Sequence, residues 1–552
     1  MLPVDVSALG ISATTVGADL VVHNGKIWTV DATYPQAQAI AIVGDRIACV
    51  GTNEEIRQWV GQKTLTLDAE GKTVLPGFID SHVHFSAGGM EVNSVQLRDA
   101  ANPQEFVRRV SESVKKLPKG EWILGGQWDH ELWPGAPYPI RGWIDKYTAD
   151  NPVLVSRRDG HMTLANSLAL RLGGITRDTA CPVGGEIVKD ASGEPTGLLK
   201  DAAIELVMRV IPSCTAEQLT SGILAAFFQA RRFGVTSIHD NSSADDMRVY
   251  QKLLNCGDLT ARIYCMLPIE QWESITYGDI RVGFDKTWIR LGALKGFVDG
   301  SLGSTTALFF EPYDDAPETS GLAGQFVVPE NRMLEMALGS DRAGLQLCIH
   351  AIGDRANCMA LDIYDEVVGK SGGTAKERRF RIEHAQTVHP ADFSRFARLG
   401  VIASVQPYHL VDDGCWTEKR IGRQRCRTTY AFRTFLNNGV RLAFGSDWTV
   451  APLNPMQGVY AALTRATSDN KNPDGWFPEQ KISLVEAIEA YTMGGAYAEF
   501  SENEKDSVTP GKLADIVVLD RDMFAASPKE IKDVKVQTTI AGGKVVYEAA
   551  SD

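Results

Sequence analysis

The chain has 552 residues, of which 44% are hydrophobic and 23% charged, an ordinary composition for a globular protein but too long for one compact core. A formal net charge of −13 argues against nucleic acid or an anionic membrane surface as a partner, and no run approaches the ~20 apolar residues of a membrane span. The nine cysteines are scattered without a C-x-x-C pair, and the first residues lack a basic segment, so we expect a reduced, cytoplasmic protein.

Both ends of the chain are predicted to form short strands. Residues 19–51 contain β-branched runs around Asn24-Gly25, a good hairpin turn, and residues 511–548 contain "ADIVVLD" and "VKVQTTIAGGKVVYE". Because chain ends often lie close together, we expect one small composite β-sandwich domain built from residues 1–75 and 498–552.

In residues 76–497, apolar strand-like runs alternate with amphipathic helix-like segments such as "AEQLTSGILAAFFQARRFG". This alternation indicates the α/β class with a parallel sheet, and about eight such units fit a TIM (β/α)8 barrel; a doubly wound sheet is the alternative. Residues 92–206 are dense in Trp, Pro and Gly and interrupt this alternation of strand-like and helix-like segments. We therefore interpret them as a subdomain inserted after the first barrel strand, with a hairpin at "GGEIVKDASGEPTGLL".

Polar side chains follow the apolar runs at the strand ends, where a TIM barrel carries its function. His82 and His84 are two residues apart and can point to the same face of a strand, and Asp80 shares that face and is expected to support the site. Imidazole and carboxylate suit Zn, with Fe, Mn or Co as alternatives. The candidate metal ligands are His82, His84, Lys295, His350, His384 and Asp447.

Each of these residues also has a plainer interpretation. A single strand histidine is commonly a hydrogen-bonded core residue, and only the set spread over several strand ends favours a metal. Lys295 would be costly to bury as an unpaired cation. It is either paired, for example with Asp299, or carbamylated and then an anionic oxygen ligand that bridges two metals.

Five motifs in this order resemble the amidohydrolase superfamily: "PGFIDSHVHF", "LKGFVDGSLGSTTA", "HAIGDRA", "RIEHAQ" and "FGSDWTVAPLNP". They are similar to its YtcJ-like branch, amidohydrolase family 3, which includes N-substituted formamide deformylase, and the resemblance covers about residues 19–548. It implies a distorted TIM barrel with a composite β-sandwich and one or two divalent cations. It also implies the ligand set given above, with Lys295 at the position of the carbamylated lysine. Thr449 and Thr305 depart from the family pattern where Pro and Arg are common, which affects substrate contacts at most.

The chemistry follows from the metal. A bound Zn²⁺ lowers the pKa of its water toward ~7 and makes hydroxide available, and Asp447 is the expected general base. His161 is expected to contact the substrate carbonyl or the oxyanion, or else to order the insertion loop. The remaining candidates for substrate binding are Trp128, Arg157, Asp299, Gln406, His409 and Trp448.

These residues predict metal-dependent hydrolysis of a non-peptide C–N bond in a small amide, an N-substituted formamide or a carbamate. The alternatives are deamination of a heterocyclic amine, hydrolysis of an ester or lactone, and, least favoured, a metal-free binding protein. We expect a small-molecule substrate as the partner, and a homodimer is the default assembly.

Overall fold

A computed structural model describes residues 17–92, 94–115, 117–212, 214–277, 287–324 and 332–550. Its centre is an eight-stranded sheet in which all neighbouring strands are parallel. Both faces of these strands are buried, as their apolar composition predicts. The strands, in sheet order, are β21 (Leu442–Phe444), β20 (Ile402–Val405), β19 (Arg381–His384), β18 (Gln346–Ala351), β17 (Ile289–Phe297), β16 (Arg262–Pro268), β15 (Val235–Asn241) and β8 (Phe78–Val83).

The sheet curves into a nearly closed, distorted TIM barrel, as expected from the sequence. The segment after β21 meets β8, because the Ser446 amide donates to Asp80 Oδ1 at 2.9 Å and the Asp447 amide donates to the His82 carbonyl at 2.7 Å. A Cβ on Gly445 would lie 2.5 Å from the His82 nitrogen, so only glycine allows this approach. Closure thus brings residues far apart in sequence to one rim.

Helices follow most of the barrel strands and pack with them in one large core. α6, which precedes β15, begins at a capping box of Thr215 and Gln218 and buries Phe227 against the barrel. The helices of this region are α2 (Phe85–Glu91), α6 (Ala216–Arg232), α7 (Ala244–Cys256), α8 (Trp272–Tyr277), α9 (Arg332–Arg342), α10 (Asp354–Ser371), α11 (Ala375–Arg378), α12 (Phe393–Leu399), α13 (His409–Asp413), α14 (Thr417–Cys426), α15 (Phe432–Asn437), α16 (Pro455–Thr464), α17 (Leu484–Ala490) and α18 (Met493–Ala498).

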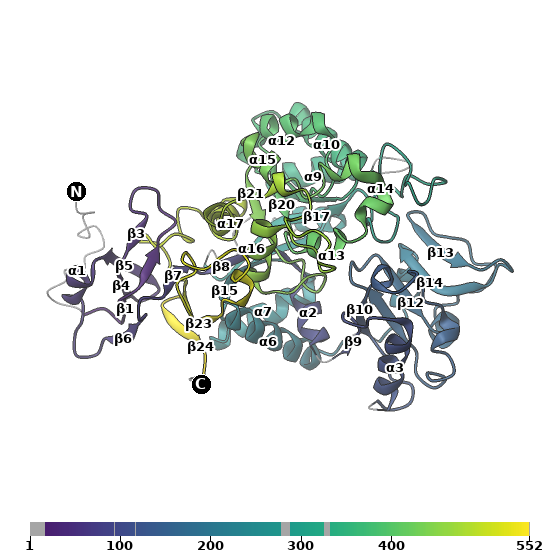
Figure 1. Cartoon of the computed structure of the whole chain (residues 1–552), viewed down its shortest axis with the longest axis horizontal. Helices are drawn as coiled ribbons and strands as arrows, with labels where there is room; N and C mark the ends of the chain where they lie inside the picture. Colours follow the sequence, from purple (N-terminus) through teal and green to yellow (C-terminus); the bar gives the residue numbers. More distant parts are fainter. Residues whose placement is uncertain are drawn as a thin grey trace.

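The two chain ends share β-structure at one end of the molecule (Figure 1). β22 pairs antiparallel with β7, and Val22 and Val518 lie in the same small apolar core. A four-stranded sheet contains β5 (Arg46–Gly51), β4 (Ala39–Val43), β1 (Leu20–His23) and β6 (Leu65–Asp68). A six-stranded sheet contains β24 (Lys544–Glu548), β23 (Val536–Ala541), β22 (Ile516–Leu519), β7 (Thr73–Pro76), β2 (Lys26–Trp28) and β3 (Gln36–Ala37).

The segment between α2 and α6 forms a subdomain on the opposite side of the barrel from the β-sandwich (Figure 1). It has a six-stranded sheet and its own apolar core, and the expected hairpin is the antiparallel pair of β13 and β14. Its strands are β13 (Gly185–Lys189), β14 (Pro195–Asp201), β12 (Met162–Ala165), β11 (Leu154–Arg157), β10 (Gly125–Trp128) and β9 (Val95–Gln96), and its main helix is α3 (Pro103–Val114).

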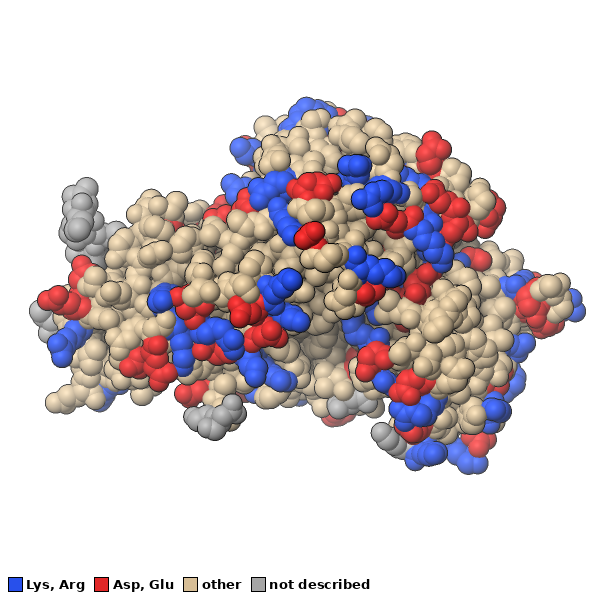
Figure 2. Space-filling view, viewed as in Figure 1, with Lys and Arg blue, Asp and Glu red and all other residues tan. Residues whose placement is uncertain are grey.

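Acidic and basic side chains are interspersed over the face shown in Figure 2. Among the described residues, no helix combines the length and the apolar character that crossing a bilayer requires.

Candidate metal centre

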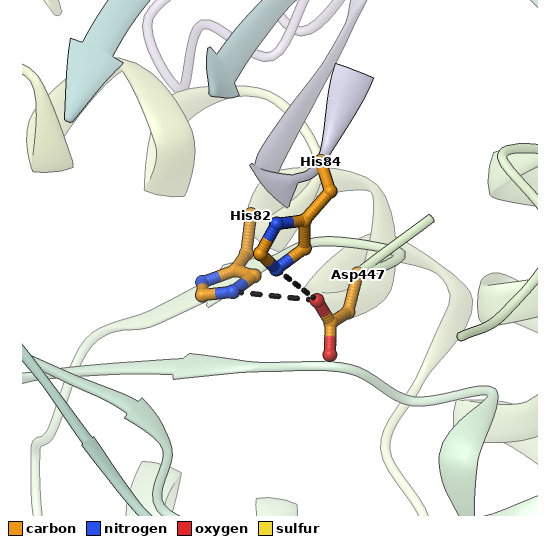
Figure 3. A group of neighbouring side chains, drawn as sticks. All are labelled: His82, His84 and Asp447. Atoms are coloured by element: carbon orange, nitrogen blue, oxygen red, sulfur yellow. Dashed lines mark ion pairs between the residues drawn. The ribbon is translucent and has the colours of Figure 1, made fainter. Parts of the chain in front are cut away.

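His82 on β8, His84 just after it and Asp447 after β21 converge at the barrel rim (Figure 3). His82 Nε2 lies 3.4 Å and His84 Nε2 3.3 Å from the same oxygen, Asp447 Oδ1. The two imidazoles reach the same side because they are two residues apart near the end of a strand. Asp447 has a φ of 55°, an uncommon backbone state for a residue other than glycine, which aims its carboxylate at the histidines.

Two further histidines lie beside this group. The rings of His384 and His409 are stacked with centroids 6.2 Å apart, and together with Asp447 they form a second set of donors whose atoms lie within 4.8 Å of one another. His384 also has a left-handed backbone, with a φ of 71°. Asp447 therefore belongs to two candidate ligand groups.

The other two expected ligands occupy the same interior. Lys295 Nζ lies 3.4 Å from His82 Nε2 in a buried position. His350 packs against His384 with ring centroids 4.5 Å apart, but its Nε2 lies 3.0 Å from the Gly300 carbonyl oxygen. His350 belongs to neither donor group found among the described residues.

The electrostatics of the site favour a cation. Burial lowers the pKa of His82 to about 4, so this imidazole is neutral, the form that ligates metals. Burial alone would raise the pKa of Asp447, but His82, His84 and His384 hold it well below its usual range. Within the described part of the chain, Asp447 Oδ1 and His409 Nε2 are buried and make no hydrogen bond. A buried N and O donor set with unshared lone pairs fits a divalent metal.

Sequence reasoning missed the residue that holds His82 in place. Glu383 Oε2 lies 2.5 Å from His82 Nδ1, and Arg381 Nε lies 2.8 Å from the other Glu383 oxygen. Arg381 also reaches His239 Nδ1 at 2.8 Å. All four side chains are fully buried. The available signal was the alternation in "RIEH", which places Arg381 and Glu383 on one face of β19.

A cavity of about 40 Å³ lies at the barrel mouth, where the insertion meets the metal centre. Its lining includes His161, Arg157, His384 and Asp447. Burial lowers the pKa of His161, but Asp201, whose Oδ1 lies 2.6 Å from Nδ1, outweighs it and the pKa rises to about 9. His161 thus enters the site as a cation from the insertion.

Three of the residues expected to bind substrate do not line the cavity at the barrel mouth. Trp128 is fully buried in the core of the insertion and donates to the Val155 carbonyl at 2.9 Å, so the expectation that it lines the pocket is wrong. Trp448 packs on α2 and lines a separate cavity of about 240 Å³. Asp299 accepts backbone amides of the loops around it, including that of Gly353 at 2.9 Å, and therefore orders those loops.

The other three line the cavity at the barrel mouth or contact a candidate metal ligand. Arg157 lines the cavity, but its guanidinium is held by Asp129 and Asp159 at 2.6 Å each. Gln406 Oε1 lies 2.8 Å from His384 Nδ1, so it orients that imidazole. His409 lines the cavity with its Nε2 4.0 Å from Asp447 Oδ2.

Comparison with known proteins places this site in context. The model of the amidohydrolase family matches residues 65–547. The chain is 39% identical to the Arabidopsis thaliana protein LONG AFTER FAR-RED 3 (96% of this chain, 92% of the relative) and 30% identical to the YtcJ protein of Bacillus subtilis (95% and 99%). It is 28% identical to the N-substituted formamide deformylase of Arthrobacter pascens (96% and 98%).

A solved structure agrees with these relatives. The crystal structure of an uncharacterized metal-dependent hydrolase from Pyrococcus horikoshii OT3 superposes with a TM-score of 0.74 at 27% identity, covering 92% of this chain and 99% of that one. The matched family region includes every candidate ligand described above. The chain belongs to the amidohydrolase family.

Proposed function

We propose that this protein is a metal-dependent hydrolase that cleaves a non-peptide C–N bond in a small, polar substrate. The observation that carries the proposal is the convergence of His82, His84 and Asp447, with both imidazole nitrogens within 3.4 Å of one carboxylate oxygen. Such a set of N and O donors at the C-terminal rim of a TIM barrel is the arrangement that hydrolytic metal sites use.

The chain's own residues supply the remaining chemistry. A divalent cation, most simply Zn²⁺, acidifies water and polarises a carbonyl when bound. Asp447 takes the proton of the attacking water and passes it to the leaving nitrogen. His161, kept cationic by Asp201, faces the cavity and donates a hydrogen bond to the oxyanion that develops on the substrate carbonyl.

We propose that Lys295 carries a carbamate. Burial lowers the pKa of its amine, which increases the neutral fraction that can attack carbon dioxide. The reaction joins the amine nitrogen to the carbon of carbon dioxide and releases one proton. The product is an anion, so it also removes the cost of a buried cation beside His82.

The substrate class rests on two supports. His161, Arg157, Asp159 and Asp413 give the cavity charged walls, which suits a polar substrate. One full-length relative is named an N-substituted formamide deformylase. Formamides, small amides and carbamates are therefore the first substrates to test.

The test is a hydrolysis screen with chelator-treated protein before and after Zn²⁺ is restored. We expect a formamide, amide or carbamate to release its amine only with the metal-restored protein, and we expect the Asp447→Asn variant to be inactive. Release of ammonia from a heterocyclic amine, or turnover confined to esters and lactones, would contradict C–N hydrolysis in favour of the alternatives. Full turnover by the Asp447→Asn variant would contradict the proton-transfer role.

A further inference from the structure

We infer that the segment leading from the barrel into the β-sandwich positions the proposed metal ligand His82 through buried polar side chains in the barrel interior. Glu499 and Lys505, both in that segment, are the positioning residues. The inference rests on the proposed metal-dependent function and adds residues at the opposite end of the barrel from the metal centre. The side chains form a polar column, which from the base of the barrel to its rim contains Lys505, Glu499, His239, Arg381, Glu383 and His82.

The polar column crosses the interior of the barrel. Arg381 Nη1, on β19, lies 2.8 Å from His239 Nδ1 on β15, although these two strands are not neighbours in the sheet. Glu383, two residues nearer the rim on β19, reaches across in the same way to His82 on β8. Branched apolar side chains usually fill such an interior, and a packed apolar core is often at least as stable as buried ion pairs. The polar column therefore indicates a role other than stability.

The base of the polar column belongs to the segment between α18 and β22. Lys505 Nζ pairs with Glu499 Oε1 and donates to Ser237 Oγ on β15 at 2.7 Å, and both charged side chains are buried. The same segment then joins the β-sandwich, where the Gly511 amide donates to the Ile47 carbonyl at 2.8 Å. A short stretch of chain thus contacts both the barrel interior and the β-sandwich.

His239 links Glu499 to Arg381. Burial lowers the pKa of His239 to about 4, so its imidazole is neutral and carries one proton. A guanidinium only donates, so Nδ1 accepts from Arg381 and the proton is on Nε2. That Nε2 makes no hydrogen bond to a described residue and lies 3.8 Å from Glu499 Oε2, so the negative charge favours this tautomer and ring orientation. Without that charge His239 is free to turn, and Arg381 loses a partner that holds it against Glu383.

The experiment measures the Zn²⁺ affinity of Glu499→Gln by competition with a chromophoric chelator. We expect the affinity to fall about 2- to 30-fold below that of the wild type, the range over which substitutions remote from a ligand change its binding. We also expect a changed visible spectrum of the Co²⁺-loaded variant, because the absorption of Co²⁺ depends on the arrangement of its ligands.

Asp515→Asn is the matched control. Asp515 forms an equally buried ion pair with Arg262 at 2.6 Å, at the same junction of barrel and β-sandwich. Among the described residues, neither of the two makes a hydrogen bond or ion pair with the polar column. We expect this control to lose stability but to keep the Zn²⁺ affinity and the Co²⁺ spectrum of the wild type.

A double-mutant cycle tests the route. If Glu499 acts through Glu383, Glu499→Gln causes no further loss of affinity in a Glu383→Gln background. Additive losses, wild-type affinity in Glu499→Gln, or an equal loss in Asp515→Asn would each overturn the inference. If Glu499→Gln does not fold, Glu499→Asp replaces it, because that variant keeps the charge but withdraws the carboxylate from His239.

The result also separates this inference from the proposed function. A wild type that binds no zinc and hydrolyses nothing would defeat both. Zinc-dependent turnover by the wild type, with unchanged zinc affinity in Glu499→Gln, would defeat only the role of the polar column.

Discussion

Replacement of Glu383 by Gln tests whether the buried carboxylate positions the proposed metal ligand His82. The variant keeps the shape of the side chain but removes the charge that pairs with Arg381 and accepts the His82 Nδ1 proton. Breaking a fully buried ion pair costs about 3–5 kcal/mol, because the remaining charge stays desolvated. Losing the group that orients a metal-binding histidine costs about 10–100-fold in metal affinity.

The assay is chemical denaturation at neutral pH together with Zn²⁺ affinity measured by competition with a chromophoric chelator. Glu502→Gln is the matched control, because Glu502 pairs with Arg379 at 2.7 Å where both side chains are about one-fifth exposed. A pair of that exposure contributes at most about 1 kcal/mol, and this one is remote from the metal centre. We expect the control to bind Zn²⁺ as the wild type does.

The pH dependence adds a second check. Burial alone would raise the pKa of Glu383, but Arg381 and His82 hold it well below its usual range. A depressed carboxyl pKa stabilises the fold at neutral pH, and that stabilisation is lost as pH falls below the unfolded value of about 4.3. The stability difference between wild type and Glu383→Gln should therefore shrink below about pH 4. Wild-type zinc affinity in Glu383→Gln, or equal destabilisation by Glu502→Gln, would refute the reasoning.

Three more outcomes are expected. Asp506→Asn should stabilise the protein, because burial raises the pKa of this carboxyl to about 8 and, among the described residues, neither oxygen has a hydrogen-bond partner. Because the pKa is raised, the folded state keeps this proton where the unfolded state releases it. The free energy of unfolding of the wild type should therefore fall, relative to that of the variant, by about 1.4 kcal/mol per pH unit between about pH 4 and 8. Equal differences in urea midpoint between the two proteins at pH 5 and at pH 7.5 would contradict this. Gly445→Ala should weaken Zn²⁺ binding, since the new Cβ would lie 2.5 Å from the His82 nitrogen and push Asp447 away, and unchanged zinc affinity would count against the close approach. Chelation should lower the free energy of unfolding by about 2.7 kcal/mol relative to protein with free metal at 100-fold its Kd, a difference that denaturant titration with and without chelator measures.

Local patterns were enough to predict most of the architecture. Apolar runs with alternating helical segments indicated a parallel barrel, and the composition of residues 92–206 indicated an insertion after the first strand. The spacing of His82, on β8, and His84, directly after it, predicted that both imidazoles face the same side, because the side-chain period of a strand is two. Asp447 was expected at the same rim, since parallel strands end on the same side of a sheet.

Patterns failed where tertiary packing decides what a side chain meets. A tryptophan in "GGQWDH" has the same local signature whether it lines a pocket or fills a core, and the packing of the insertion put Trp128 in the core. Glu383 was overlooked because its importance comes from His82, which is 301 residues away in the chain. Likewise, His409 is the first residue of the short helix α13 after β20, where no strand periodicity predicts a direction for its ring.

By itself, the sequence determined which residue types stand at the strand ends, because strand and helix periodicities are local properties of the chain. Closure of the barrel decided which of those residues meet. It brought Asp447 against His82 through the hydrogen bonds between Ser446 and Asp80, and it placed His409 rather than His350 opposite Asp447. These contacts join segments hundreds of residues apart, and their geometry depends on how all eight strands pack together.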